Sequence, residues 1–448
     1  MSSASSRLPA TWFSAALLAA PVAHAQSITF TLIANQSTPS TDGSTIRGFN
    51  TPQLGGSTVV FGAHSENGLY SLFAAPAAGG ALVKLADQNT PVPGGTGDFT
   101  PGDRGFVQPF QREGCNVPVV GSTHAAFVGN DAAGQFGVYS VPLTGGKTVL
   151  LVNDGTPIPG GPVPPQGVTN FNASYIPCNV SILGNSVTFD VIGGDGDGVY
   201  SVATNGHKLA RIADNNTAEP ATGPFPTAGN FFEPTMAGKT IVYIGATTGG
   251  PYGIYTGGNA TPIAPVITDG DSEASDFDQF ANPSVAHGTI LFAAAYDLSE
   301  NVNVLATVPL AGAAPKIIFN LQSTKIPAGA LGDSFSQLGT DVNNYLGNDG
   351  YRRIFSAATQ DLPPKPANTY DGVFTVCHGK LTKIMQTGDT VGTAQLRAIN
   401  GISNLQLVTI GGTKVDQFAA LITLGPATIP PTVDDGSPGI YVITMPDC

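Results

Sequence analysis

The chain has 448 residues, a formal net charge of −13 and only 11% charged residues, with 57 glycines and 36 prolines. The acidic balance argues against a nucleic-acid or anionic-membrane partner, because such partners need clustered lysine and arginine. A composition rich in Gly, Pro, Thr, Val and Ile is typical of short strands joined by many turns rather than of helices.

Residues 1–25 have the pattern of an export signal. Arg7 supplies a positive start, a short apolar run follows, and Ala-His-Ala at 23–25 fits a small-x-small cleavage pattern before Gln26. The apolar run is too short to span a bilayer, and no later stretch is long enough. We therefore expect an exported protein without a membrane span, located in the periplasm or the medium.

A turn rich in proline and glycine recurs seven times after this segment. Its copies begin at Asn35, Asp87, Asn153, Asp214, Thr268, Asn320 and Gln386. Before most copies lie short runs of β-branched and aromatic residues, such as SVTFDV at 186–191 and DGVYSV at 197–202, which are typical of strands. Units of about four strands in seven copies predict an all-β, seven-bladed β-propeller of four-stranded blades, forming one domain over residues 26–448.

The two ends of the repeat array complement each other. The first turn copy lacks the strands that precede the others, and the last strands lack a following turn. We therefore predict that the N-terminal strand Ile28–Ala34 closes the last blade as its outermost strand, beside Ile440–Met445. Such closure removes an exposed sheet edge.

Four cysteines follow the export signal, and an even number in an exported chain indicates two disulfides. Cys115 and Cys178 occupy the same place in the second and third repeats, so we predict that they pair. Cys377 follows a strand of the sixth repeat and Cys448 lies just past the last strand, so we predict a second pair beside the closing seam. No C-x-x-C spacing indicates a zinc site.

The repeat resembles those of exported bacterial propellers. The resemblance rests on runs such as STVVFGA at 57–63 and NGLYSL at 67–72, followed by NTPVPGGTGDF at 89–99. It is loosely similar to TolB-type repeats and more closely similar to secreted bacterial seven-bladed propeller proteins of largely unassigned function. This resemblance implies the fold and no particular activity. We expect neither the extra α/β domain of TolB nor a hydrolase domain, because the repeats fill the chain and no G-x-S-x-G elbow occurs.

Loops that lead from an outer strand to the next inner strand gather on one face of a propeller, where rigidly held loops commonly carry function. Alignment of the inner strands places one polar residue at the start of each: Asn50, Asn116, Asn179, Glu233, Asn282, Asn343 and Asn404. If these side chains point inward, they form a collar that binds a polar ligand, ordered water or a cation. The alternative is that each Asn bonds its own turn backbone. Arg47 and Arg112, near the same loops, are further candidate ligand-binding residues.

Aromatic residues recur after the turns. They are Phe99, Phe106, Phe110, Phe171, Tyr175, Phe225, Phe231, Phe232, Phe277, Phe280 and Phe335. Because they recur in phase with the repeat, we interpret most of them as packing between blades, with sugar-stacking platforms as the alternative. Tyr175 carries a polar group and is the better surface candidate.

Glu233 departs from the amide pattern of the collar, which makes it the leading catalytic candidate. Glycoside hydrolysis needs two carboxylates, for which Glu113 and Asp278 are candidate partners. A lyase would instead need a base such as Tyr175 and an arginine to hold a uronate.

The loop at 268–280 is the most acidic copy of the turn. Its Asp269, Asp271 and Asp276 are candidate Ca²⁺ ligands, although the EF-hand spacing is absent and a solvated surface is the alternative. We expect no other cofactor.

We predict a monomer that binds an extracellular ligand at the channel mouth, with a carbohydrate polymer as the leading class. The first alternative is a polysaccharide-degrading hydrolase or lyase that uses the same mouth, and the second is an adhesion or scaffold protein. Whether the chain is an enzyme stays open, because no catalytic constellation is visible in the sequence.

Overall fold

The computed structural model describes residues 28–100, 118–161, 170–171, 177–191, 197–214, 217–219, 223–224, 230–246, 252–258, 261–269, 277–296, 303–339, 347–426 and 436–448. At a few strand positions, among them Cys178 and Asp278, only the backbone is described.

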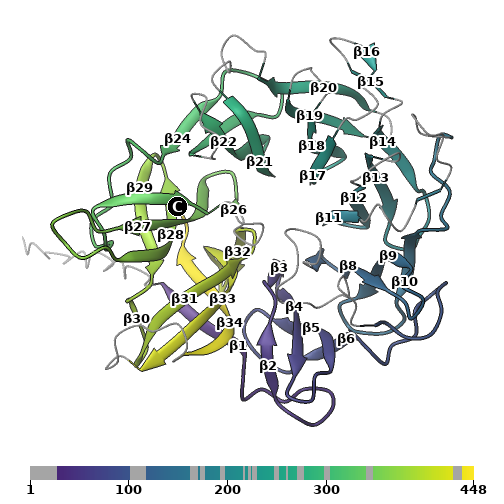
Figure 1. Cartoon of the computed structure of the whole chain (residues 1–448), viewed down its shortest axis with the longest axis horizontal. Coiled ribbons are helices and arrows are strands. Elements are labelled where there is room, and N and C mark those ends of the chain that lie inside the picture. Colours follow the sequence, from purple (N-terminus) through teal and green to yellow (C-terminus); the bar gives the residue numbers. More distant parts are fainter. Residues whose placement is uncertain are drawn as a thin grey trace, which may run out of the picture.

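Seven antiparallel sheets stand around a ring, and each forms one blade (Figure 1). Blade 1 contains β2 (Ile46–Phe49), β3 (Gln53–Gly55), β4 (Thr58–Ser65), β5 (Tyr70–Pro76) and β6 (Val83–Asp87). Blade 2 contains β7 (Val119–Val120), β8 (His124–Asn130), β9 (Phe136–Pro142) and β10 (Val149–Asn153). Blade 3 contains β11 (Pro177–Leu183), β12 (Ser186–Val191), β13 (Gly198–Ala203) and β14 (Ala210–Asp214).

The remaining blades follow in chain order. Blade 4 contains β17 (Asn230–Ala237), β18 (Thr240–Ala246), β19 (Gly253–Gly258) and β20 (Thr261–Thr268), and a small ribbon of β15 (Ala218–Glu219) and β16 (Gly223–Pro224) precedes it. Blade 5 contains β21 (Phe277–Ala286), β22 (Thr289–Tyr296), β23 (Val304–Pro309) and β24 (Lys316–Asn320). Blade 6 contains β25 (Ser334–Leu338), β26 (Gly347–Asn348), β27 (Arg352–Gln360), β28 (Thr369–Cys377) and β29 (Lys380–Gln386). Blade 7 contains β30 (Thr390–Val391), β31 (Ala394–Ile402), β32 (Gln406–Ile410), β33 (Thr413–Pro426), β34 (Ser437–Pro446) and β1 (Thr29–Asn35).

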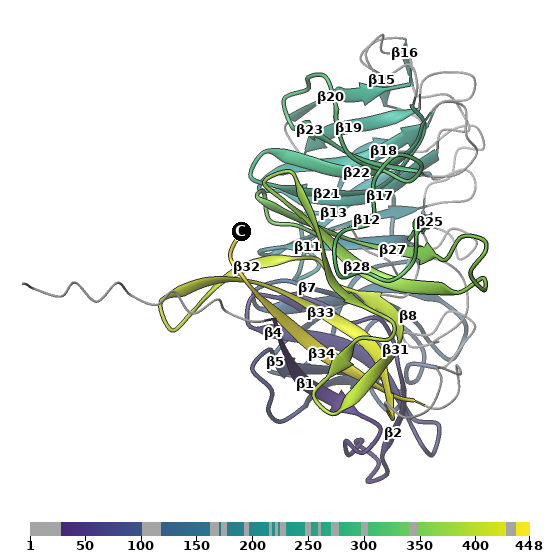
Figure 2. The same cartoon turned by 90° about the vertical axis from the view of Figure 1, so that its left-hand side faces the viewer.

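The ring closes through the first strand, as the sequence predicts. β1 pairs antiparallel with β34, in a register that runs from Thr29 opposite Thr444 to Asn35 opposite Gly439. The last blade therefore joins both ends of the repeat array. The pairing with β1 covers the edge of β34 that would otherwise be exposed. Seen from the side, the β32–β33 hairpin projects beyond the other blades (Figure 2).

The recurring turn begins at the last residue of every outer strand. In most copies an Asn or Asp there exchanges hydrogen bonds with a Thr three residues later. At Asp87, the carboxylate accepts from the Thr90 hydroxyl at 2.9 Å, while the Asp87 N–H donates to Thr90 Oγ1 at 2.9 Å. The same reciprocal pair joins Asn153 to Thr156. The repeated Asn/Asp-x-x-Thr pattern is therefore an Asx-type turn at the end of most outer strands. Its side chains form hydrogen bonds with backbone groups where the chain turns inward.

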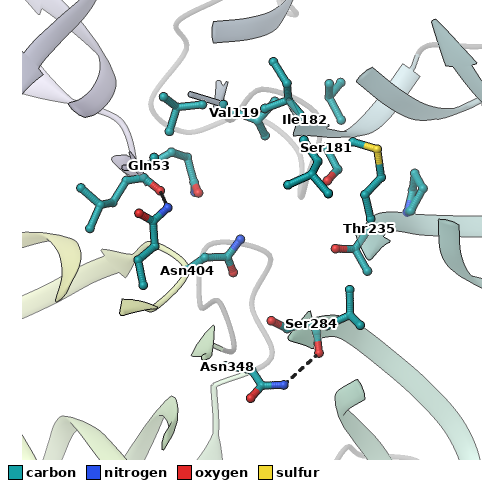
Figure 3. A pocket seen from close by; sticks show the side chains of 18 of the residues that line it. Gln53, Val119, Ser181, Ile182, Thr235, Ser284, Asn348 and Asn404 are labelled. Carbon is teal, nitrogen blue, oxygen red and sulfur yellow. Dashed lines mark hydrogen bonds between the residues drawn. The ribbon is translucent and has the colours of Figure 1, made fainter. Parts of the chain in front are cut away.

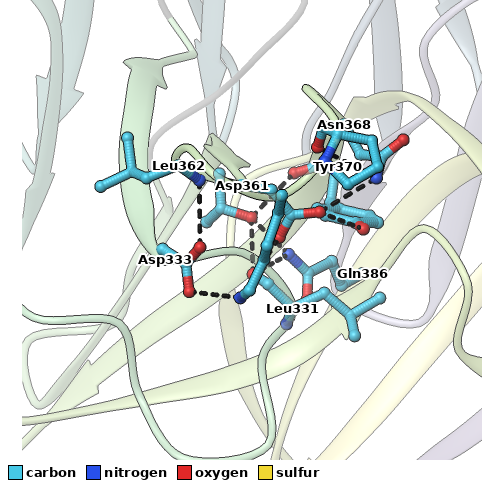
Figure 4. A network of polar contacts seen from close by, with 10 residues as sticks. Leu331, Asp333, Asp361, Leu362, Asn368, Tyr370 and Gln386 are labelled. Carbon is cyan, nitrogen blue, oxygen red and sulfur yellow. Dashed lines mark hydrogen bonds and ion pairs between the residues drawn. The ribbon is translucent and has the colours of Figure 1, made fainter.

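The seventh copy of the turn uses a longer side chain (Figure 4). Gln386 donates from Nε2 to the Thr359 hydroxyl at 2.7 Å and accepts from the Leu331 N–H at 2.6 Å. Beside it, Lys365 forms an ion pair with Asp333 at 2.6 Å. These bonds hold the β27–β28 turn against the segment that leads into blade 6.

Buried apolar residues form seven clusters, and each lies at the seam between two neighbouring blades. The predicted packing role of the aromatic residues is confirmed for those that are described and buried: Phe99, Phe171, Phe231, Phe277, Phe280 and Phe335. Phe171, for example, meets Tyr200 edge to face, with ring centroids 4.9 Å apart. Within the described part of the chain, no helix has the length and apolar character to cross a membrane.

Candidate functional site

The inner strands of all seven blades surround a cavity of about 620 Å³ on the propeller axis (Figure 3). Its wall combines amides, hydroxyls and aliphatic side chains. The polar lining side chains are Gln53, Ser122, Asn179, Ser181, Glu233, Thr235, Asn282, Ser284, Asn348, Asn404 and Gln406. A cavity of this volume lies within the range of small-ligand sites.

A β-bulge near the start of several inner strands sets which side chains enter the cavity. In β17 the register shifts between Phe232 and Thr235, and in β21 it shifts between Ala281 and Ser284. At the bulges, Glu233 has φ 52° and Asn282 has φ 53°, a left-handed conformation that Asn tolerates better than most residues. Strand alternation beyond each bulge then directs Thr235 and Ser284 into the cavity.

Two carboxylates, one of which lines the cavity, link three blades beside it. Asp190 of β12 is fully buried and accepts hydrogen bonds from the Asn179 N–H and the Asn179 amide, both at 2.7 Å. Asp190 also accepts the N–H of Glu233 from the next blade at 3.1 Å. The Glu233 carboxylate in turn accepts the N–H of Asn282 from the blade after that. In both cases the bulge turns a backbone N–H away from the sheet to which it belongs, and a carboxylate of the preceding blade accepts that N–H.

The pKa of Glu233 is raised from 4.5 to about 7. Burial is the main cause, and the charge of Asp190 adds to it, whereas the hydrogen bond from the Asn282 N–H opposes it. Glu233 is the only charged residue among the described residues that line the cavity. A carboxyl group that titrates near neutral pH in a cavity has the property expected of a general acid or base.

The polar side chains of the wall fall into two groups. Asn179, Asn348 and Gln406 are engaged by the protein itself. Asn348 donates to the Thr289 carbonyl at 3.2 Å, and Gln406 bridges the backbone of Leu54 and Gly56. These three amides position strands.

The second group is open to a ligand. Within the described ranges, no protein hydrogen bond engages the side-chain polar atoms of Ser181, Thr235, Asn282, Ser284 and Asn404. The Nε2 of Gln53 is buried and likewise has no partner there. Figure 3 shows several of these side chains directed toward one another across the cavity.

The structure brings together part of the predicted collar. Asn179, Glu233, Asn282 and Asn404 line the cavity. Asn50 does not line it, because its N–H bonds the Gly62 carbonyl at 2.9 Å and its side chain is buried in blade 1. Arg47 is also away from the wall, exposed and 3.8 Å from Glu66. In blade 6, Asn348 lines the wall, whereas Asn343, which the alignment placed in the collar, is outside the described residues.

Several predicted site residues lie outside the part of the chain that the structure describes: Arg112, Glu113, Asn116, Tyr175, Asp271 and Asp276. For Asp278 only the backbone is described. Of the acidic loop, Asp269 is described, and its N–H bonds the Tyr252 carbonyl at 2.9 Å. The proposed pairing of Cys115 with Cys178 also lies outside the described residues.

The second predicted disulfide is present. Cys377 and Cys448 are bonded, with their Cα atoms 5.9 Å apart. This bond joins β28 of blade 6 to the end of β34 in blade 7. A disulfide is typical of proteins in an oxidising compartment rather than of cytoplasmic ones.

Sequence reasoning missed several wall residues, namely Gln53, Ser181, Thr235, Ser284 and Asn348. They lie two or more residues from the aligned collar, and only the bulge register shows that they face inward. Asp190 offered a stronger signal, since an acid in the middle of the apolar run at 186–191 is rare without a structural or functional reason.

No protein-family model and no curated protein matches the chain. Solved structures do match it. Oligogalacturonate lyase from Vibrio parahaemolyticus aligns over 94% of this chain and 98% of that protein, with 8% identity and a TM-score of 0.50. The β-propeller domain of the Trilobed protease from Pyrococcus furiosus aligns over 84% of this chain and 94% of that chain, with 9% identity and a TM-score of 0.44.

A TolB-like protein from Agrobacterium tumefaciens aligns over 66% of this chain and 90% of that chain, with 14% identity and a TM-score of 0.38. At these identities the likeness concerns the fold alone. The ring of seven antiparallel sheets, each with four or more strands, makes the chain an all-β, seven-bladed β-propeller.

Proposed function

We propose that this propeller is an exported binding protein whose axial cavity takes an uncharged, hydroxyl-rich ligand, with the end of a carbohydrate chain as the leading class. The observation that carries the proposal is the set of free amides and hydroxyls from five blades that face one cavity. Each of these groups exchanges hydrogen bonds readily with a sugar hydroxyl, since hydroxyls and amides both donate and accept. Aliphatic lining residues such as Val119 and Ile182 offer contact area for the apolar face of a ring.

The charge of the described wall favours an uncharged ligand. Glu233 is ionised at pH 8 and would repel a carboxylate, and no arginine, lysine or histidine occurs among the described lining residues to offset it. A uronate is therefore a poorer fit to this wall than a neutral sugar.

A glycan array with the purified chain tests the proposal. We expect binding to neutral oligosaccharides and weaker or no binding to uronate polymers. An array that shows no binding, or binding only to uronates, would count against the proposal.

A second candidate, a polysaccharide-degrading enzyme, rests on the raised pKa of Glu233. In this proposal Glu233 transfers a proton to or from a sugar bound in the cavity. Incubation of bound glycans with the wild-type chain and with Glu233→Gln separates the candidates. Turnover that disappears in the variant supports the enzyme, whereas binding without turnover in the wild type supports the binding protein.

Export, a monomeric state and Ca²⁺ binding by the loop at 268–280 remain part of the proposal. The Cys377–Cys448 disulfide supports export, because such bonds persist in the periplasm and the medium.

A further inference from the structure

Three potential metal ligands meet where the last strand reaches blade 6, away from the axial cavity. Cys377 ends β28, His378 begins the turn to β29, and Cys448 follows β34. The two sulfur atoms and a ring nitrogen of His378 all lie within 4.8 Å of one another. Cys377 and Cys448 are half-buried and His378 is exposed.

Contacts other than the disulfide keep these residues together. Arg352 donates from Nη2 to the Pro446 carbonyl at 2.8 Å and forms an ion pair with Asp416 at 2.9 Å. Cys377 itself is paired with Lys380 in the β28–β29 ladder. Both sulfur atoms would therefore remain close to each other if the bond between them were reduced.

The histidine is already oriented. Its Nε2 lies 3.1 Å from the main-chain oxygen of Cys448, the last residue of the sequence. That oxygen only accepts, so in the neutral imidazole Nε2 carries the proton and Nδ1 keeps a free lone pair. A metal-bound imidazole is commonly fixed in this way, by a hydrogen bond from its other nitrogen to a carboxylate or a backbone carbonyl.

We propose that the reduced protein binds one Zn²⁺ through the Cys377 and Cys448 thiolates and the imidazole of His378. Two thiolates and one imidazole are a zinc ligand set, and a water molecule completes the tetrahedron. A zinc ion about 2.3 Å from each sulfur requires only that the sulfurs move apart, while the Cα atoms, at 5.9 Å, keep their places.

Reduction of the disulfide requires a dithiol reductant. The Cys377–Cys448 disulfide takes up two electrons and two protons from the dithiol, which leaves as a disulfide. The two thiols then lose two protons as they bind Zn²⁺. The end of β34 would thus be tied to blade 6 by a covalent bond in the oxidised protein and by a metal ion in the reduced one. The 71 residues between the cysteines explain why no zinc motif is visible in the sequence.

Titration of the full chain with Co²⁺ after reduction by a phosphine tests the site, followed by displacement with Zn²⁺. The background is Cys115→Ser with Cys178→Ser, so that the other two thiols do not contribute. We expect a thiolate-to-cobalt absorption band that saturates at one equivalent in the reduced protein and is absent from the oxidised protein. His378→Ala should weaken binding at least about tenfold.

His287 supplies a matched control. Like His378 it is exposed, precedes a glycine in a strand-to-strand turn and has φ 47°. His287→Ala should leave metal affinity unchanged. An equal loss of metal affinity in both histidine variants would overturn the proposal. So would the absence of a saturable thiolate-to-cobalt band in the reduced protein. If the serine background does not fold, the same comparison of His378→Ala with His287→Ala in the reduced wild-type chain decides it.

Discussion

Glu233 holds a left-handed backbone conformation at a position where two neighbouring blades carry Asn, and its carboxylate is already occupied by the N–H of Asn282. Part of its departure from the repeat is therefore structural. The Glu233 carboxylate accepts a backbone N–H across the seam between blades 4 and 5, just as Asp190 does across the seam between blades 3 and 4. The remaining difference from the asparagines of the neighbouring blades is electrostatic, since burial raises the pKa of Glu233 to about 7.

Replacement of Glu233 by Gln should change how stability depends on pH. The carboxyl pKa is about 7 in the folded protein and near 4.5 when unfolded, so its contribution is fully present below pH 4.5 and is lost as pH rises through 7. At pH 8 the ionised group costs on the order of 3 kcal/mol. Gln keeps an acceptor for the Asn282 N–H without ionising.

Urea unfolding at pH 5 and pH 8 measures this effect. The free energy of unfolding of the wild type should fall between the two pH values by more than that of Glu233→Gln. Parallel pH dependence in the two proteins would mean that Glu233 does not titrate in this range.

Asp190→Asn should be strongly destabilising. Asp190 is fully buried and accepts three hydrogen bonds, so an amide there points an N–H group at donors. We expect a loss of about 2–3 kcal/mol in the free energy of unfolding, measured in urea at pH 7. Asp98→Asn, at an exposed position in the turn of blade 1, should stay within about 0.5 kcal/mol of the wild type. A similar small effect at both sites would show that the Asp190 contacts contribute little.

Sequence patterns located four residues of the cavity wall, Asn179, Glu233, Asn282 and Asn404, but not their role. Asn282 and Glu233 were aligned correctly, yet the reason for Asn at this position is the left-handed bulge, which no periodicity reveals. Asn50 aligned equally well and is turned into blade 1, because its N–H bonds the Gly62 carbonyl instead of a neighbouring blade.

The strands and turns were the most predictable elements. Each recurring turn starts where an outer strand ends, from Asn35 in β1 to Gln386 in β29. The repeat made this visible, since the same turn follows the strands in every copy. The split inner strands of blades 1, 6 and 7 were not predictable, because bulges depend on contacts with the neighbouring sheet.

The seam between β27 and β33 should depend on Arg352. Its buried guanidinium pairs with Asp416, whose pKa is raised by burial and by the adjacent Asp349 carboxyl. Arg352→Met would leave two buried carboxyl groups facing each other, so we expect a loss of about 3 kcal/mol or more in the free energy of unfolding. The raised pKa means that Asp416 ionises as pH rises, so the loss should be greater at pH 8 than at pH 5.

Urea unfolding at the two pH values checks this expectation. Arg47→Met is the control, because Arg47 is exposed and its contact with Glu66 is 3.8 Å long. A loss in Arg352→Met that is no larger than in the control, or that shrinks at pH 8, would contradict the role given to Arg352.

The whole molecule follows from repetition and closure. Seven copies of one unit, with a strand exchanged between the ends, predict a ring, and the seven apolar seams follow from it. The axial cavity does not follow from the repeat in the same way. Its chemistry depends on which residue of each inner strand faces the axis, and that is fixed by bulge positions such as Phe232 to Thr235.

Calorimetric titration of the neutral oligosaccharide selected by the array, with the wild-type chain and a Ser284→Ala/Asn404→Ala double variant, tests the cavity directly. These two free polar groups face the cavity from blades 5 and 7, and the loss of their hydrogen bonds should weaken binding about tenfold or more. Gln337→Ala, an exposed amide of blade 6 that does not line the cavity, is the matched control and should bind as the wild type does. Unchanged affinity in the double variant would contradict a ligand site in the axial cavity.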